Sequence, residues 1–464
     1  MSVVVGPRRA FGEEVPVLVV GAGACGLVAA LAARDAGAEV LVLERDARPA
    51  GSTALSSGFI PACATRWQRE RGIDDPVAQM VADIQRKNHG EADARVVAAV
   101  CGASGPTLEW LADAHGVGFV LVDGFLYPGH SALRMHATPE KTGAALLAAL
   151  ERAAVAAGID ILTAAHVRTV FADADRRVTG VAFERPGGAV EEVGCAALVL
   201  ACSGFGGDRA LVRTHLPEIA DALYFGHAGN QGDALRWGTA LGAATRDLSA
   251  YQGHGSVATP HGILVTWALM MEGGFQVNAR GERFSNEHAG YSEQCLPVLE
   301  QPGGVAWCVF DERLHQLGAT FDDYRRADAL GAVRSGASVA ALAAACGLPP
   351  DRLAATFRQV ERCATGEARD PFGRDFTGKP PLAPPYRAIK VTGALFHTQG
   401  GLVVDPRGRV LDRSGAPLPN LFAGGGAACG LSGAHVWGYL SGNGLLSAVV
   451  LGRLAGEAAA ALGR

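Results

Sequence analysis

The sequence predicts an α/β fold in which a Rossmann-like domain is interrupted by an inserted α+β capping domain. Three observations support this prediction: a complete strand–glycine turn–helix–strand unit near the N-terminus, two later strand-and-glycine segments, and a long stretch of different texture between those two segments. We expect the first part of the Rossmann-like domain at residues 1–246, the capping domain at 247–385 and the second part of the Rossmann-like domain at 386–464.

The first of these observations is a complete βαβ unit. Residues 17–20 form an apolar, β-branched run that leads into the turn Gly21-Ala22-Gly23-Ala24-Cys25-Gly26. The alanine-rich residues 27–36 predict a helix, and residues 40–43 predict a second strand that ends at Glu44. A strand, a glycine turn, a helix and a second strand followed by an acid are typical of a dinucleotide-binding unit.

Each glycine of this turn has its own structural task. Gly21 permits the tight turn, Gly23 lets the backbone approach a pyrophosphate, and Gly26 lets the helix pack closely on the strand. The pyrophosphate is expected at the helix N-terminus, where free N–H groups and the helix dipole favour anions. Glu44 is expected to accept hydrogen bonds from a ribose. The alternative is a glycine-rich turn without a ligand.

A small, hydroxyl-rich loop follows the second strand. Arg45 and its neighbours lead into Gly51-Ser52-Thr53-Ala54-Leu55-Ser56-Ser57-Gly58, which can run along an extended cofactor and offer it N–H and O–H donors. The glycine turn, Glu44 and this loop together resemble the FAD-binding half of the fumarate reductase and 3-ketosteroid dehydrogenase flavoproteins, of the FAD-binding 2 type. This resemblance implies FAD, held by a domain of the glutathione-reductase type. In the succinate dehydrogenase branch a histidine of this loop bonds the flavin covalently; Ser52 takes that place here, so we expect non-covalent FAD.

Two later segments extend the resemblance over nearly the whole chain. Residues 201–206, Ala-Cys-Ser-Gly-Phe-Gly, resemble the family's second flavin segment, and residues 418–426 resemble its final one. Residues 441–445 open the last helix, whose N-terminus would stabilise negative charge on a reduced flavin. Asp233 precedes another helix, where it either caps that helix or contacts the cofactor. The resemblance implies the cofactor-binding residues Gly21, Gly23, Ala24, Cys25, Gly26, Glu44, Arg45, Gly51, Ser52, Thr53, Ser56, Ser57, Gly58, Val167, Ala201, Cys202, Ser203, Gly204, Asn230, Asp233, Gly424, Gly425, Asn443 and Leu445.

Composition and charge argue against several other classes of protein. The chain has 464 residues and a net charge of -5, which gives no footprint for nucleic acid or an anionic membrane. No apolar run approaches the ~20 residues of a membrane span. Residues 1–16 lack the apolar core of a secretory signal, so we expect a mobile tail and a cytoplasmic protein. Ten cysteines are scattered without a CxxC pair, which predicts reduced thiols and no metal centre.

Four positions distinguish the branches of this family. His254, in Tyr-Gln-Gly-His-Gly, resembles the histidine that meets a substrate carboxylate in fumarate reductases, and His397 matches a second reductase histidine. Tyr291 follows a segment similar to the family motif GxRFxNE; fumarate reductases carry their proton-donating arginine there, and ketosteroid dehydrogenases carry a tyrosine base. Tyr439 lies nearest the place of the arginine that clamps a carboxylate. Both arginines are missing, which argues against fumarate reduction.

The resemblance to ketosteroid dehydrogenases implies roles for these side chains. A ketone makes the neighbouring proton acidic when its developing enolate oxygen receives hydrogen bonds. We expect Tyr291 to remove that proton with the help of Tyr127, because a free tyrosine has a pKa of about 10 and needs a partner. Tyr439 and backbone N–H groups around Ser441 would hold the ketone oxygen, and His254 would stabilise charge. Each tyrosine can instead be a structural residue of the core.

The irregular segment 120–138 adds polar candidates, because loops carry binding sites more often than helices do. The polarity of the expected pocket suits a small ring ketone, with or without a carboxylate. The residues expected to bind substrate are His130, Arg134, His136, His397, Ser441 and Gly442.

The sequence thus predicts an FAD-dependent dehydrogenase that introduces a C=C bond next to the ketone of a small cyclic substrate similar to 4-oxocyclohexanecarboxylate. The alternatives are a reductase of an activated C=C bond such as that of urocanate, an enoate or fumarate, a 3-ketosteroid dehydrogenase, or a flavin-binding redox sensor without turnover. No nicotinamide fingerprint is visible, so we expect an external electron acceptor: oxygen, a quinone or an electron-transfer protein.

Overall fold

The larger part of the molecule is built on a nine-stranded sheet. The computed structural model describes residues 1–462. The strand order is β1-β8-β9-β10-β2-β3-β7, with β21 pairing β10 and β20 pairing β21. The strands are β1 (Ser2–Val5), β2 (Glu14–Val20), β3 (Val40–Leu43), β7 (Asp160–Leu162), β8 (His166–Ala172), β9 (Val178–Glu184), β10 (Val190–Leu200), β20 (Arg409–Leu411) and β21 (Pro417–Ala423).

The centre of this sheet is parallel and fully buried. Strands β21, β10, β2, β3 and β7 run parallel, and residues 17–20 of β2 are apolar on both faces because helices cover both sides. The antiparallel strands β8, β9 and β10 form a meander beside these strands. The Rossmann-like fold is confirmed.

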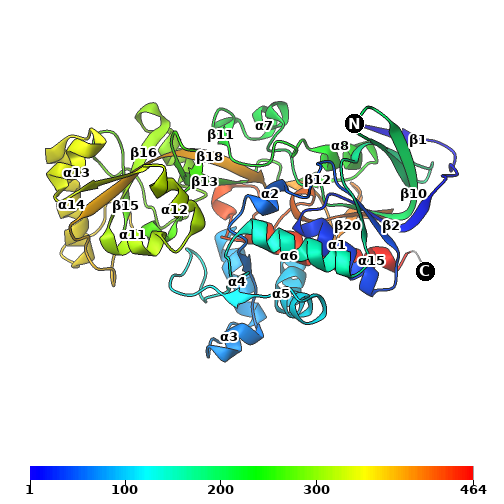
Figure 1. Cartoon of the computed structure of the whole chain (residues 1–464), viewed down its shortest axis with the longest axis horizontal. Helices are drawn as coiled ribbons and strands as arrows, with labels where there is room; N and C mark the ends of the chain where they lie inside the picture. Colours follow the sequence, from blue (N-terminus) through cyan, green and yellow to red (C-terminus); the bar gives the residue numbers. More distant parts are fainter. Residues whose placement is uncertain (463–464) are drawn as a thin grey trace.

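Helices pack on this sheet and below it (Figure 1). The helix α15 lies against α1 at very short range, since a Cβ on Gly456 would stand 2.1 Å from the Ala29 carbonyl oxygen. The helices of this part are α1 (Ala24–Asp35), α2 (Gly51–Ala54), α3 (Arg66–Glu70), α4 (Val77–Lys87), α5 (Ala94–His115), α6 (Gly143–Ala156), α7 (Arg209–His215), α8 (Asp233–Ala240) and α15 (Asn443–Ala460).

Two local expectations are wrong. The N-terminal segment is no mobile tail: β1 pairs in parallel with β8, because its β-branched residues add a strand to the sheet edge. A proline inside a helical pattern predicts a helix boundary near residue 105, yet α5 continues through Pro106 as one helix.

The cap is a second lobe with its own seven-stranded sheet, seen at the left of Figure 1. Its strand order is β14-β13-β18-β16-β15, and β11 and β17 also pair with β18. The strands are β11 (Leu223–Tyr224), β13 (Tyr251–Ala258), β14 (Ile263–Leu264), β15 (Phe275–Val277), β16 (Val305–Asp311), β17 (Val333–Gly336) and β18 (Tyr386–Thr398). The helices are α9 (Ala268–Met271), α10 (Cys295–Leu299), α11 (Glu312–Gly318), α12 (Asp322–Ala329), α13 (Val339–Cys346) and α14 (Pro350–Ala364).

The long strand β18 joins the two lobes. It pairs with cap strands over its whole length, and it ends at His397 and Thr398 beside the first residues of β13. The capping sheet therefore reaches beyond residue 385, while the domain limits of 1–246, 247–385 and 386–464 remain an interpretation. Two small sheets, β4 (Ile60–Pro61) with β6 (Met135–Ala137) and β5 (Val120–Leu121), and β12 (Thr245–Arg246) with β19 (Gly401–Leu402), complete the fold.

Residues 1–462 contain no helix that could span a membrane, no cluster of metal ligands and no disulfide. No helix there is long and apolar enough to cross a bilayer, and no three His, Cys, Asp or Glu side chains gather as metal ligands would. All ten cysteines are free thiols.

Candidate active site

One large cavity runs from the carboxyl end of β2 to the inner face of the cap. The glycine turn and the hydroxyl-rich loop line one end, and tyrosines, histidines and Trp267 line the other. Of the residues predicted to bind the cofactor, those that line the cavity are Gly21, Gly23, Ala24, Cys25, Glu44, Arg45, Gly51, Ser52, Thr53, Ser56, Ser57, Val167, Ala201, Cys202, Ser203, Asn230, Asp233, Gly425 and Leu445.

Five predicted cofactor residues lie beneath the cavity instead. A Cβ on Gly58 would meet the Thr142 carbonyl, and one on Gly204 would meet the Thr398 side chain. These two glycines allow close packing under the cavity wall, and direct contact of all five residues with the cofactor remains a prediction. The five residues are Gly26, Gly58, Gly204, Gly424 and Asn443.

The glycine turn has the geometry that its spacing predicts. Gly21 has φ +106°, and a Cβ there would stand 2.6 Å from the Ala201 carbonyl oxygen. A Cβ on Gly26 would stand 1.8 Å from the Gly21 oxygen, which is why only glycine lets α1 lie this close. A Cβ on Gly23 would meet only the Thr53 hydroxyl, at 3.5 Å. It precedes α1 without a side-chain cap, so backbone N–H groups remain available to an anion.

Glu44 is held at the end of β3 by the backbone. Its two carboxylate oxygens accept from the Ala22 N–H at 2.8 Å and from the Asp46 N–H at 3.0 Å. A carboxylate has about four lone-pair sites, so each oxygen can accept a further hydrogen bond from a ribose hydroxyl.

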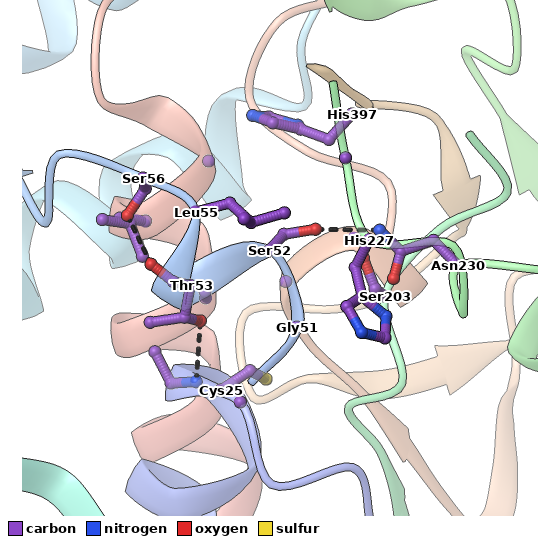
Figure 2. Close-up of a pocket in the computed structure, with 18 of the residues that line it drawn as sticks. Cys25, Gly51, Ser52, Thr53, Leu55, Ser56, Ser203, His227, Asn230 and His397 are labelled. Atoms are coloured by element: carbon purple, nitrogen blue, oxygen red, sulfur yellow. Dashed lines mark hydrogen bonds between the residues drawn. The ribbon is translucent and has the colours of Figure 1, made fainter. Parts of the chain in front are cut away.

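Ser52 stands on the cavity wall in the loop after Glu44. Its hydroxyl accepts a hydrogen bond from the Asn230 amide at 2.8 Å, across the cavity in Figure 2. Thr53 accepts from the Ala24 N–H at 3.1 Å, which fixes the loop to the first turn of α1.

Several buried polar atoms on this wall have no hydrogen-bond partner within residues 1–462. They include the Trp237 indole N–H, Nε2 of His166 and one carboxylate oxygen of Asp233, all of which line the cavity. Both polar atoms of the Asn443 side chain, just behind the wall, are also unpartnered. Unpaired buried groups are costly unless a ligand satisfies them, so this wall fits a large polar cofactor. Sequence reasoning missed Trp237, which nothing in its helical pattern marks, whereas His166 directly precedes the predicted cofactor residue Val167.

Three tyrosines meet at the other end of the cavity. The Tyr291 ring centroid lies 6.1 Å from that of Tyr127 and 6.1 Å from that of Tyr439. The side chains of Tyr439 and Ser441 and the backbone of Gly442 lie near the Tyr291 hydroxyl. Burial raises the pKa of Tyr291 to about 12, although these neighbouring groups lower it, and burial also raises the pKa of Tyr439.

The two predicted histidines in this part of the cavity are neutral near pH 7. Burial lowers the pKa of His254 to about 3 and that of His397 to about 4. The His254 ring stacks on Tyr291 at 4.7 Å and 20°. His254 lines the cavity, and its buried Nδ1 has no hydrogen-bond partner within residues 1–462, so its charge-stabilising role remains a prediction.

Arg134 and the histidines near it do not reach the cavity. The Arg134 guanidinium binds the carboxylates of Asp75 and Asp83 at 2.6–2.9 Å, and its side chain is fully buried. His136 bonds to the Arg134 carbonyl and to Thr65. The expected contact of Arg134, His136 and His130 with substrate is thus corrected: buried carboxylates and backbone groups satisfy these side chains.

Within residues 1–462, Arg45 is the one arginine or lysine that lines the cavity, and it lies at the cofactor end. Its guanidinium donates to the Gly229 carbonyl at 2.9 Å. The opposite end is lined by aromatic and apolar residues that sequence reasoning did not single out, among them Trp267, Phe396 and Leu264. They come from the capping sheet and the segments beside it, where the sequence has no pattern that selects single residues.

Comparison with known proteins agrees with this geometry. The family model described as FAD binding domain matches residues 16–445, so the chain belongs to this family, of the FAD-binding 2 type. It is 28% identical to a probable fumarate reductase of Shewanella frigidimarina, over 97% of this chain and 75% of that protein. It is also 28% identical to the 4-oxocyclohexanecarboxylate 2-dehydrogenase of Sinomonas cyclohexanicum, over 98% and 94%. The solved 3-ketosteroid-Δ4-(5α)-dehydrogenase of Rhodococcus jostii superposes with a TM-score of 0.78 at 27% identity, over 98% of both chains.

The family establishes the class of protein. The chain is an FAD-binding oxidoreductase of the kind that acts on C=C and CH–CH bonds, which confirms the predicted cofactor, fold and enzyme class. The residues lining the cofactor end, with their unpaired donors and acceptors, are the ones that would hold FAD.

Proposed function

We propose that this protein is a dehydrogenase that introduces a C=C bond next to the ketone of a cyclic substrate. The observation that carries the proposal is the cluster at the cap end of the cavity, where the hydroxyls of Tyr291, Tyr439 and Ser441 meet the backbone of Gly442. Such a cluster offers a base together with uncharged donors for an enolate oxygen.

Each member of this cluster has a role in the proposal. Tyr439 and the Gly442 N–H donate hydrogen bonds to the ketone oxygen, which makes the α-proton acidic. Tyr291 takes that proton, and the ring of Tyr127 packs against it and helps to exclude water. FAD held at the other end of the cavity would supply the oxidising power by accepting the hydride of the neighbouring carbon. The relative named 4-oxocyclohexanecarboxylate 2-dehydrogenase supports this reaction class.

The cavity favours an uncharged ketone over a carboxylated one. Its cap end has no arginine or lysine among residues 1–462, and His254 and His397 are neutral because burial lowers their pKa values. A carboxylate buried there would lack a counter-ion, which is costly. The aromatic lining also accommodates a larger ring system, so a 3-ketosteroid is the second candidate, with the same chemistry.

Anaerobic reduction of the holoenzyme, without NAD(P)H, tests the proposal. The flavin absorbance is followed after addition of cyclohexanone, 4-oxocyclohexanecarboxylate, its methyl ester, or a 3-ketosteroid. We expect a neutral ketone to bleach the flavin, and the ester to do so faster than the acid. Re-oxidation of dithionite-reduced enzyme by fumarate or urocanate, with no bleaching by any ketone, would identify a C=C reductase instead. A protein inert in both assays would be a flavin-binding protein without turnover.

The electron acceptor is proposed on chemical grounds alone. Reduced flavin must be re-oxidised by oxygen, a quinone or an electron-transfer protein, and steady-state assays with each acceptor would rank them.

A further inference from the structure

His130 lies outside the cavity and yet touches two segments that line it. Its ring Nε2 stands 3.0 Å from the Ser441 carbonyl oxygen, and its backbone N–H donates to the Tyr127 carbonyl at 3.2 Å. The side chain is buried, and its partner Ser441 lies near the Tyr291 hydroxyl. His130 therefore connects the turn that carries Tyr127 with the segment that carries Tyr439 and Ser441.

The neighbouring arginine determines which ring nitrogen of His130 carries the proton. Nη1 of Arg134 stands 3.4 Å from Nδ1 of His130, and a guanidinium can only donate. Nδ1 must then accept, so the hydrogen is on Nε2 and is donated to the Ser441 carbonyl. Arg134 cannot turn away, because Asp75 and Asp83 hold it from two sides at 2.6–2.9 Å.

The Ser441 carbonyl and the Gly442 N–H are the two ends of one peptide group. This group is planar, and in the trans form its C=O and N–H point in opposite directions. A hydrogen bond that fixes the carbonyl therefore also fixes the direction of the N–H, which stands at the Tyr291 hydroxyl. Gly442 has φ +84°, a left-handed conformation that favours glycine.

The turn and the segment also fit tightly. A Cβ on Gly129 would stand 2.8 Å from Cδ1 of Leu440, so the turn 127–130 lies directly against residues 439–442. A change at His130 would thus be transmitted to the peptide that binds the ketone oxygen.

We propose that His130, held as its Nε2–H tautomer by Arg134, is a positioning residue that aims the Gly442 N–H at the substrate oxygen. This role rests on the proposed ketone chemistry. Because donors preorganised toward a developing oxyanion contribute strongly to rate, an N–H that is free to turn would lose that contribution.

Three variants test the role: His130→Leu, which removes the donor, His130→Gln, which restores an N–H at about the position of Nε2, and His136→Leu as a matched control. His136 is equally buried and also bonds to Arg134, but through the Arg134 carbonyl and without touching Ser441. If His130→Leu fails to fold, His130→Asn, whose amide is too short to reach Ser441, takes its place.

The first readout is anaerobic flavin reduction by a neutral ketone. We expect His130→Leu to lower the limiting rate about 10- to 100-fold, a smaller loss than deletion of the donor itself would cause. The KM and the FAD content should change little. His130→Gln and His136→Leu should stay within about fivefold of wild type. Equal losses in His130→Leu and His136→Leu would overturn the inference, since both would then report only on stability.

The second readout does not depend on turnover. 4-Methylphenol presents an oxygen on a flat ring, as an enolate does, and its binding to the oxidised holoenzyme is followed by the flavin spectrum. We expect His130→Leu to raise the Kd about 10-fold and His130→Gln to restore it. An unchanged Kd, or no binding by wild type, would overturn the positioning role. If the wild type binds the phenol but no ketone reduces its flavin, the proposed function is contradicted. The Kd values of the His130 variants for the phenol then decide the role of His130.

Discussion

At the scale of single residues, two opposing effects act on the pKa of the Tyr291 hydroxyl. Burial raises this pKa to about 12, and the neighbouring groups of Ser441, Tyr439 and Gly442 lower it. The raised value means that Tyr291 is almost entirely neutral at pH 7. Only the phenolate can accept a proton. At pH values below 12, its fraction increases about tenfold with each unit by which the pH rises.

The rate of flavin reduction by a ketone should therefore rise between pH 7 and pH 10. Stopped-flow measurements across this range, at saturating ketone, provide the profile. A rate that is flat or falls with pH, with the flavin still bound, would speak against a tyrosine base.

Glu44 gives the matching prediction at the cofactor end. Glu44→Ala removes the acceptor for the ribose and leaves the Ala22 and Asp46 N–H groups unpaired, so FAD binding should weaken by about 1–3 kcal/mol. The FAD that acid precipitation releases into the supernatant gives the FAD content of each variant. Its release also tests the non-covalent binding that we expect because Ser52 replaces the flavin-linking histidine. Glu39→Ala, at an exposed position just before β3, is the control. Equal FAD content in both variants would assign the ribose to another group.

At the scale of elements, glycines set how closely α1 packs. Gly26→Ala would push a Cβ to 1.8 Å from the Gly21 carbonyl oxygen, and backbone cannot yield cheaply. We expect a loss of stability of about 1–3 kcal/mol or more, together with loss of FAD. Gly102→Ala in α5 has no atom within 4 Å of the new Cβ, so it should be neutral or stabilise by up to ~1 kcal/mol. Urea unfolding measures the free energy of unfolding of both variants. Equal changes in Gly26→Ala and Gly102→Ala would contradict the packing role of Gly26.

The elements also show what a sequence can predict. Residues 40–43 are β3 as expected, since a short apolar β-branched run between turn signals has few other solutions. The N-terminal strand β1 was missed because its partner, β8, lies more than 160 residues away. Arg134 was assigned to substrate because no local pattern reveals that Asp75 and Asp83 converge on it. Motif residues were thus predictable, whereas the partners of isolated polar residues depended on tertiary contacts.

At the scale of the whole molecule, one ion pair connects the lobes. Within residues 1–462, Lys87 at the end of α4 and Glu293, two residues after Tyr291, are the one ion pair between the Rossmann-like part and cap residues 251–398. Lys87 also donates to the Ala289 carbonyl at 3.0 Å. The pair therefore fixes the position of the segment that carries Tyr291 against the other lobe.

Lys87→Met should leave the Glu293 carboxylate largely buried without its partner. We expect the free energy of unfolding in urea to fall by about 1–3 kcal/mol, between the values for exposed and buried pairs. Lys379→Met, which breaks a pair with Glu272 inside the cap, is the comparison. If the two variants lose equal stability and equal activity, the pair between the lobes has no special role.

The central claim is that Tyr291 removes the proton next to a ketone, and one substitution tests it most directly. Tyr291→Phe keeps the ring that packs against His254 and Tyr127 and removes only the hydroxyl. Tyr324→Phe is the control, because this buried tyrosine shares a hydrogen bond with His315 at 2.7 Å and does not line the cavity. Anaerobic stopped-flow reduction of the flavin by a neutral cyclic ketone should be about 100- to 10,000-fold slower in Tyr291→Phe and unchanged in Tyr324→Phe. Reduction of Tyr291→Phe within threefold of wild type would contradict the account.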